Sequence, residues 1–175
     1  GANGTWTFRE TLQRVTITNR SDKDIVINDI DVVRGDQPLV WLNPAKNVTI
    51  DFNIENEVAP TLIEITNTGD SDVYINGTIE NPIGTTSILN TDGSVFATKD
   101  RDEDDGRVSL IRTHILRIDA SEGVGSDPDS SGHRVNVDIV DSAGLPEDAV
   151  FNTSRVSGLT DEIFLGHENR FFTGQ

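Results

Sequence analysis

The sequence predicts an all-β protein, a parallel β-solenoid with about 24 residues per coil. Three observations predict this fold: identical turn residues recur at one period, short segments alternate apolar and polar residues, and no long stretch has helical periodicity. An antiparallel β-sandwich is the alternative, because it also produces regular short strands. A sandwich, however, does not require the same turn residues to return at a fixed interval.

The period is set by asparagines that follow the alternating segments. Two segments, VTITNRSDKDIVIND (15–29) and IEITNTGDSDVYING (63–77), match along their whole length, which makes Asn19 and Asn67 equivalent. Asn43 lies midway between them, and Asn90 follows Asn67 after almost the same interval. We expect these four asparagines to form a ladder at one corner, because an amide both donates to and accepts from its neighbours above and below.

The elements follow in chain order from this repeat. In VTITN, IVIND, VTIDFNI and VYING, Ile and Val alternate with polar residues, which indicates strands with one buried face. One coil cannot bury its apolar face alone, so coils stack and share a core. The expected inward stack is Ile17, Trp41, Ile65 and Ile88.

We expect one domain over residues 1–175. Its regular coils span about 15–97, an acidic loop insertion spans 98–107, and looser coils span 108–175. After Asn90 the register loosens, and later turns are expected near Asp119, Asp141 and Leu165, each placed to within about one residue. The chain contains no methionine, so we expect it to be a segment of a longer protein.

Composition excludes several classes of function. The formal charge is −16, from 30 acidic and 14 basic residues, and this negative field argues against binding nucleic acid or anionic membranes. There is no apolar run long enough to insert into a membrane. The chain has no cysteine, so disulfides, thiolate chemistry and cysteine-ligated zinc are excluded.

A family resemblance rests on the segment ITNTGDSDVYINGTIENPIGTTSILNTDGSV (65–95). This segment resembles the repetitive stretches of large bacterial exoproteins of the filamentous haemagglutinin type. The resemblance implies a right-handed parallel β-helix, in line with the usual hand of parallel β connections. It also implies an extracellular or cell-surface stalk or adhesin segment, and it carries over no catalytic residue.

Two acidic segments hold candidate Ca²⁺ ligands. In DPDSSGHRVNVD, the oxygens of Asp127, Asp129, Ser131 and Asp138 fall at loop positions 1, 3, 5 and 12, with glycine at position 6. An ordinary Asp/Ser/Gly turn explains the same residues. The insertion KDRDEDDGR adds Asp100, Asp102 and Asp104 as further candidate ligands. The alternative is that this insertion is a solvated charged loop.

Other carboxylates recur in the repeat without forming a predicted site. The pairs Asp22/Asp24 and Asp70/Asp72 are two periods apart, and residues 47 and 48 occupy the intervening coil. We therefore expect no continuous carboxylate ladder, only solvated turn residues. The three histidines have no paired spacing, and no serine stands in a nucleophile motif.

These observations favour a non-catalytic structural or adhesive segment of a larger surface or secreted protein. Its expected partners are adjoining coils of the parent chain or identical subunits, together with surface glycans or a protein of a host or of a cell surface. A subunit of a self-assembling extracellular filament is one alternative, since open solenoid ends can stack. A carbohydrate-active β-helix enzyme is the other, and Ca²⁺ is the only cofactor considered.

Overall fold

A computed structural model of the chain describes residues 13–33, 39–43, 48–53, 60–98, 109–125, 134–140 and 148–152. The secondary structure in these ranges is β1 (Gln13–Asn19), β2 (Ile25–Asp31), β3 (Leu39–Asn43), β4 (Thr49–Asn53), β5 (Thr61–Asn67), β6 (Val73–Ile75), β7 (Thr78–Asn90), β8 (Ser94–Ala97), β9 (Leu110–Ala120), β10 (Gly123–Val124), β11 (Val137–Ile139) and β12 (Asp148–Asn152). The predicted all-β class is confirmed. Within these ranges no helix is long and apolar enough to cross a membrane.

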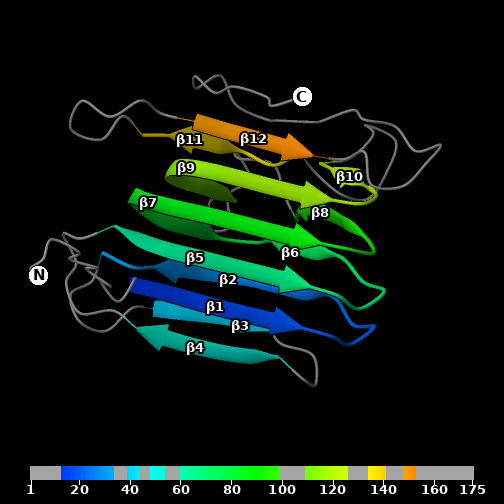
Figure 1. The fold of residues 1–175 in the computed structure, drawn as a ribbon. Helices are drawn as coiled ribbons and strands as arrows, with labels where there is room; N and C mark the ends of the chain where they lie inside the picture. Colours follow the sequence, from blue (N-terminus) through cyan, green and yellow to red (C-terminus); the bar gives the residue numbers. More distant parts are fainter. Residues whose placement is uncertain are drawn as a thin grey trace, which may run out of the picture.

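The strands join into one sheet that is mostly parallel. Of the strand pairings in the described part of the chain, only β1 with β4 and β2 with β3 are antiparallel. In Figure 1, β4, β1, β5, β7, β9 and β12 follow one another up the near side of the molecule. An antiparallel sandwich does not fit this pairing.

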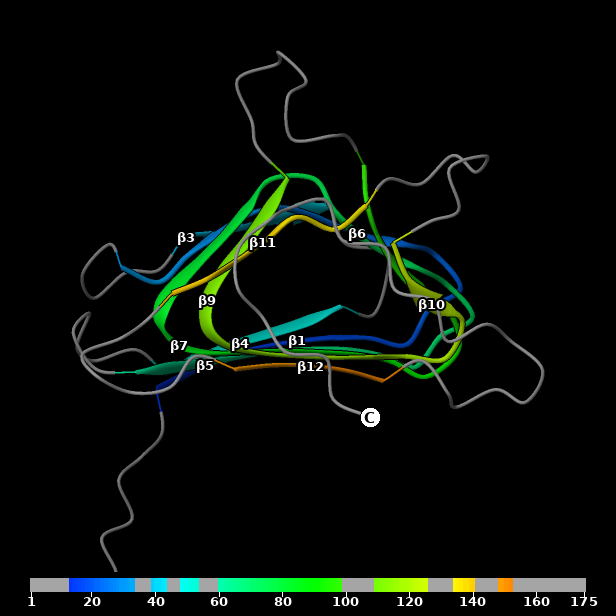
Figure 2. The ribbon, with the colours of Figure 1, turned by 90° about the horizontal axis from the view of Figure 1, so that it is seen from above.

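Successive layers of the stack are in register. Ile17 pairs with Ile65, which pairs with Ile88, which in turn pairs with Ile118. Parallel neighbours lie about 4.8 Å apart, so each isoleucine contacts the equivalent side chain of the next layer. Figure 2, which looks down the stack, shows the described strands enclosing a roughly triangular cross-section.

Each side of the triangle is one set of stacked strands. The first side combines β1, β5 and the later halves of β7 and β9. The second side combines β2, β6, β8 and β10, and the third stacks the end of β2 on the first halves of β7 and β9 and on β11. The long strand β7 belongs to two sides because its register with β9 shifts between Asn81 and Thr85, where the chain rounds the corner.

The core is built from the inward residues of all three sides. In β1 and β5 buried residues alternate with more exposed ones, as the sequence pattern predicts. Two further fully or almost fully buried columns are Ile25, Val73, Val95 and Val124 on the second side, and Ile30, Ile79, Ile111 and Val137 on the third. Burying each such side chain contributes roughly 1.5–3 kcal/mol, so stacking supplies the stability that one coil lacks.

The asparagine ladder is confirmed for three of its four predicted members. The Nδ2 of Asn19 donates to Oδ1 of Asn67 at 2.9 Å, and the Nδ2 of Asn67 donates to Oδ1 of Asn90 at 3.2 Å. All three side chains are fully buried. Each Nδ2 also donates to the backbone carbonyl four residues later in its own turn, which closes the corner locally.

The predicted places of Asn43 and Trp41 are wrong. The strand β3 pairs antiparallel with β2 and puts Asn43 opposite Val26, so β5 and not β3 is the parallel neighbour of β1. The Oδ1 of Asn43 accepts a hydrogen bond from Asn28 in a different corner, at 3.2 Å. Trp41 is 46% exposed instead of pointing inward. Asn43 and Trp41 lie one period from Asn19 and Ile17, but their strand turns back and runs antiparallel to β2. Antiparallel pairing also satisfies the free backbone groups at the edge of the first layer.

The turn expected near Asp119 lies within one residue of its predicted place. Asn90 pairs with Ala120, and Asp119 pairs with Leu89. A shift of one residue exchanges the inner and outer faces of a strand, so Ala120 is buried at the end of the ladder. The turns expected near Asp141 and Leu165, and the insertion from residue 99, lie outside the described residues.

Candidate functional site

Most of the candidate calcium ligands lie outside the described residues, namely Asp100, Asp102, Asp104, Asp127, Asp129 and Ser131. The remaining one, Asp138, lies in β11 on the third side. In the part of the chain that the structure describes, no three His, Asp or Glu side chains are grouped closely enough to hold a metal ion.

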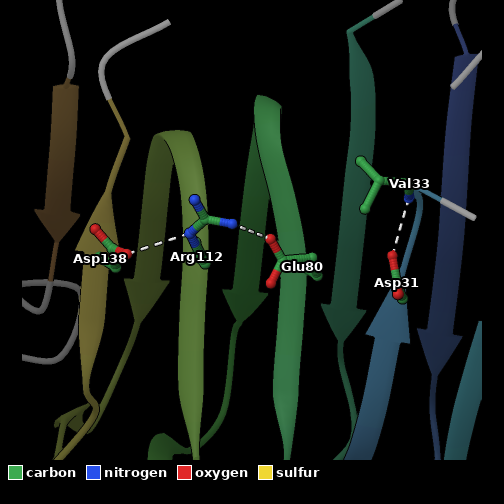
Figure 3. Close-up of polar contacts among 5 residues, drawn as sticks. All are labelled: Asp31, Val33, Glu80, Arg112 and Asp138. Atoms are coloured by element: carbon green, nitrogen blue, oxygen red, sulfur yellow. Dashed lines mark hydrogen bonds and ion pairs between the residues drawn. The ribbon is translucent and has the colours of Figure 1, made fainter. Parts of the chain in front are cut away.

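Asp138 belongs to a row of charged residues that crosses four neighbouring strands. We call Asp31, Glu80, Arg112 and Asp138 the charged row, since each pairs with the next. The Nη1 of Arg112 contacts Oε1 of Glu80, and its Nε donates to Oδ2 of Asp138 at 3.3 Å. Figure 3 shows the guanidinium between the two carboxylates.

Arg112 is the one cation of the charged row, and it contacts the carboxylates of both its neighbours. Burial lowers the pKa of Arg112, but the hydrogen bonds and charges of Glu80 and Asp138 outweigh it, so the pKa lies above its ordinary value. Asp31 accepts a hydrogen bond from the backbone N–H of Val33 at 2.9 Å (Figure 3). Because Asp138 is engaged by Arg112, a calcium ion at this carboxylate would compete with a cation already present.

The carboxylates at the corner between the first and second sides lie closer together than the sequence predicted. The backbone N–H of Asp72 donates to Oδ1 of Asp24 at 2.8 Å, so the expectation that an intervening coil separates these residues is wrong. Because β3 and β4 turn back, the turns 20–24 and 68–72 belong to adjacent layers. The Oδ1 of Asp72 accepts the backbone N–H of Ser94 in the layer after that, at 2.9 Å.

We call the carboxylates of this edge the acidic corner; they are Asp24, Asp70, Asp72, Asp92 and Glu122. Burial raises the pKa of Asp72, as do the charges of Asp24 and Asp70, and the hydrogen bond from Ser94 opposes them in part. Burial and the charges of Asp72, Asp92 and Asp70 likewise raise the pKa of Glu122. The carboxylates therefore repel one another along a corner that spans four layers.

An aromatic row lies beside the acidic corner on the outside of the second side. It consists of Val26, Tyr74 and Phe96, which pair strand to strand and alternate with buried core residues. The ring centroids of Tyr74 and Phe96 are 5.5 Å apart with their planes tilted by 40°, an arrangement that aromatic pairs favour. Burial raises the pKa of the Tyr74 hydroxyl, and so do the nearby charges of Asp72 and Asp24.

Sequence reasoning missed both the aromatic row and the acidic corner as contiguous surfaces. The signal was present, because Val26 and Tyr74 are separated by the same interval as Asn19 and Asn67. The link from Glu80 to Arg112 had no such signal, since the interval between them exceeds one period and the repeat is lost there.

His114 is buried and contacts the backbone of the neighbouring layer. Its side chain is 4% exposed and its Nδ1 lies 2.7 Å from the carbonyl oxygen of Val140. A carbonyl only accepts, so Nδ1 carries the proton in this contact.

Comparison of the chain with protein-family models, with curated proteins and with solved structures finds no match.

Proposed function

We propose that this chain is a non-catalytic structural and adhesive segment of an extracellular or cell-surface protein. In this proposal the strands form a right-handed parallel β-helix with a basic repeat of about 24 residues per coil. The observation that carries the proposal is the in-register stacking of like residues at the corner and in the core, as in Asn19, Asn67 and Asn90.

The spacings of paired residues support the proposed repeat. Asn67 and Asn90 differ by 23 in sequence position, and Asn19 and Asn67 differ by 48. The longer step covers two periods, because the residues of one period form β3 and β4, which pair antiparallel with the first layer. The step from Asn90 to Ala120 is also longer than one period, because it includes the acidic insertion. The right hand follows from the general chirality of parallel β connections.

The use of polar groups supports a structural role. The buried amides of the ladder and the buried hydroxyls of Thr86 and Thr113 bond to one another or to backbone carbonyls of neighbouring layers. Such networks specify register, because a slipped layer would leave buried polar groups unpaired. Outward-facing side chains are then available as a binding surface, the second element of an adhesive segment.

The test is adhesion by the intact chain. Beads carrying the folded chain at equal density are applied to immobilised glycans and to immobilised extracellular proteins, and their detachment under flow is measured. Beads carrying the heat-unfolded chain are the control. Retention of the folded chain alone supports the proposal, and equal release of both preparations from every surface contradicts it.

A self-assembling filament is the second candidate, because the large exposed hydrophobic side chains of the described residues gather at one end of the stack. They are Val33 after β2, Trp41 in β3 and Ile50 in β4, at 37%, 46% and 38% exposure. In Figure 1, β4 is the outermost described strand at that end. Light scattering over a wide concentration range decides: growth of the scattering mass supports the filament, and a constant monomer mass contradicts it.

A further inference from the structure

We propose that the outer face of β2, β6 and β8 is a docking surface for an arginine- or lysine-bearing segment of another protein. The aromatic row supplies the contact area and the carboxylates beside it supply the charge. This inference names the partner of the proposed adhesive function and rests on it.

The first step is the geometry of the face. Asp24 and Val26 alternate with buried Ile25, and Asp72 and Tyr74 alternate with buried Val73, so each carboxylate projects on the same side as the row residue two positions later. Since the two strands are parallel and in register, the carboxylates form one row and the apolar side chains the next. A ligand crossing the layers meets both rows at once.

The second step is the charge of the corner. The layers are numbered here from β2 through β6 and β8 to β10. The turns that lead into the second to fourth of them, 68–72, 91–94 and 121–123, hold Asp70, Asp72, Asp92 and Glu122 and no basic residue. The first layer differs, since Arg20 and Lys23 accompany its carboxylates. A cationic ligand placed over the upper layers relieves repulsion that the free protein bears.

The third step is the chemistry of the rings. Tyr74 and Phe96 form a paired π surface that is partly open to solvent. A guanidinium or ammonium group over such a ring gains about 0.5–1 kcal/mol at an exposed site. The carboxylates of Asp72 and Asp24 lie near enough for their charges to act on Tyr74, so ring and carboxylates favour one kind of ligand, a cation with an apolar stem.

The probe is a peptide of alternating arginine and glycine, titrated into the isotopically labelled full chain. A peptide with glutamine in place of arginine is the matched control. We expect the arginine peptide alone to shift the resonances of Tyr74 and Phe96 in a saturable way. Replacing both rings, Tyr74→Leu with Phe96→Leu, is expected to weaken binding about fivefold or more, and Tyr74→Phe, which keeps the ring, is expected to retain it.

The charge contribution is measured with two double variants of equal net charge. Asp70→Asn with Asp92→Asn removes two carboxylates of the acidic corner, and Asp51→Asn with Glu64→Gln removes two from β4 and β5 on the first side. We expect about threefold or greater weakening only for the corner variant. Equal weakening by both pairs, or none on removing the rings, overturns the proposal in favour of unspecific attraction to a chain of charge −16.

Further outcomes separate this inference from the function on which it rests. If a neutral oligosaccharide shifts Tyr74 and Phe96 and the arginine peptide does not, the docking proposal is overturned and the face binds glycans. If beads adhere under flow equally with and without both rings, the adhesive function stands and this docking surface is wrong. If no bead adheres, the adhesive function fails, while the titration in solution still decides whether the face binds cations.

Discussion

The buried amide of Asn67 links its own layer to the layers on both sides, because it accepts a hydrogen bond from Asn19 at 2.9 Å and donates one to Asn90 at 3.2 Å. The same Nδ2 donates to the carbonyl of Ser71 at 2.8 Å. One side chain therefore holds its own turn closed and fixes the register of the layers on both sides. These directional hydrogen bonds add to the register that the buried aliphatic pattern sets, since a slipped layer would leave buried amides unpaired.

Replacing Asn67 with alanine tests the ladder. The variant leaves the Asn90 Oδ1 and the Ser71 carbonyl without this donor, and buried polar groups that lose a partner cost about 1–3 kcal/mol. We expect the free energy of unfolding in urea to fall by that amount. Thr66→Ala is the control, because Thr66 precedes Asn67 in β5 and is only half-buried; its effect is expected within about 0.5 kcal/mol. Similar losses in both variants would show that the amide is not special.

A Gly77→Ala variant tests the close approach of adjacent layers at the corner between the second and third sides, where β6 is followed by β7. A Cβ at this position would lie 1.6 Å from the carbonyl oxygen of Asn28, so the two turns must separate. We expect a loss of about 1–3 kcal/mol, the usual cost of overpacking, measured by chemical denaturation. Ser87→Ala, on the half-buried outer face of β7, is the control. A stable Gly77→Ala protein would mean that the turns pack less closely than described.

The pH dependence of stability tests the acidic corner through Asp72. The folded-state pKa of Asp72 is raised by burial and by Asp24 and Asp70, so the folded state binds a proton more tightly than the unfolded state. The associated stabilisation is complete below 3.8, the ordinary pKa of an aspartate, and is lost as pH rises through the raised folded-state pKa.

Asp72→Asn should therefore stabilise the protein at pH 7 but not at pH 3. Asparagine keeps an Oδ1 that can accept the Ser94 N–H, while the repelled charge is removed. Since the group is half-exposed and screened by solvent, we expect a gain on the order of 0.5 kcal/mol. Thermal unfolding of both proteins from pH 3 to pH 8 measures the difference. A variant that is less stable at neutral pH would show that the carboxylate is stabilising.

Substitution of Arg112 tests the charged row. Arg112→Met keeps the apolar stem but leaves Glu80 and Asp138 on either side without their shared cation. We expect a loss of about 0.5–1 kcal/mol at low salt that shrinks in molar NaCl, because exposed charges are screened. Arg117→Met, in the same strand and paired with Ser87, is the control. A loss that does not change with salt would assign the effect to packing.

The calcium hypothesis is tested at Asp138. Because this carboxylate is engaged by Arg112, we expect Asp138→Asn to leave the Ca²⁺ dependence of the melting temperature unchanged. The melting temperature is compared in CaCl₂, in EDTA and in NaCl of matched ionic strength. A Ca²⁺-specific rise that disappears in Asp138→Asn would instead identify Asp138 as a ligand, since binding to the native state alone raises stability.

The sequence by itself determined the class of structure and the residues that repeat from layer to layer. Alternation of Ile and Val with polar residues identified strands with one buried face, and the match between segments 15–29 and 63–77 identified Asn19 and Asn67 as equivalent. The alternation is visible within a single strand, and the equivalence is visible as a match between two segments of the sequence, so neither needs coordinates.

The tertiary structure decided which strands are neighbours. A spacing of one period is compatible with another parallel layer and with a strand that turns back, and Asn43 belongs to a strand that turns back. That reversal brings Asp24 against Asp72 and makes Asn67, two periods along the chain, the neighbour of Asn19. Chain length limits how far a segment can reach, but hydrogen bonding at the free edge of a sheet determines the direction in which it pairs.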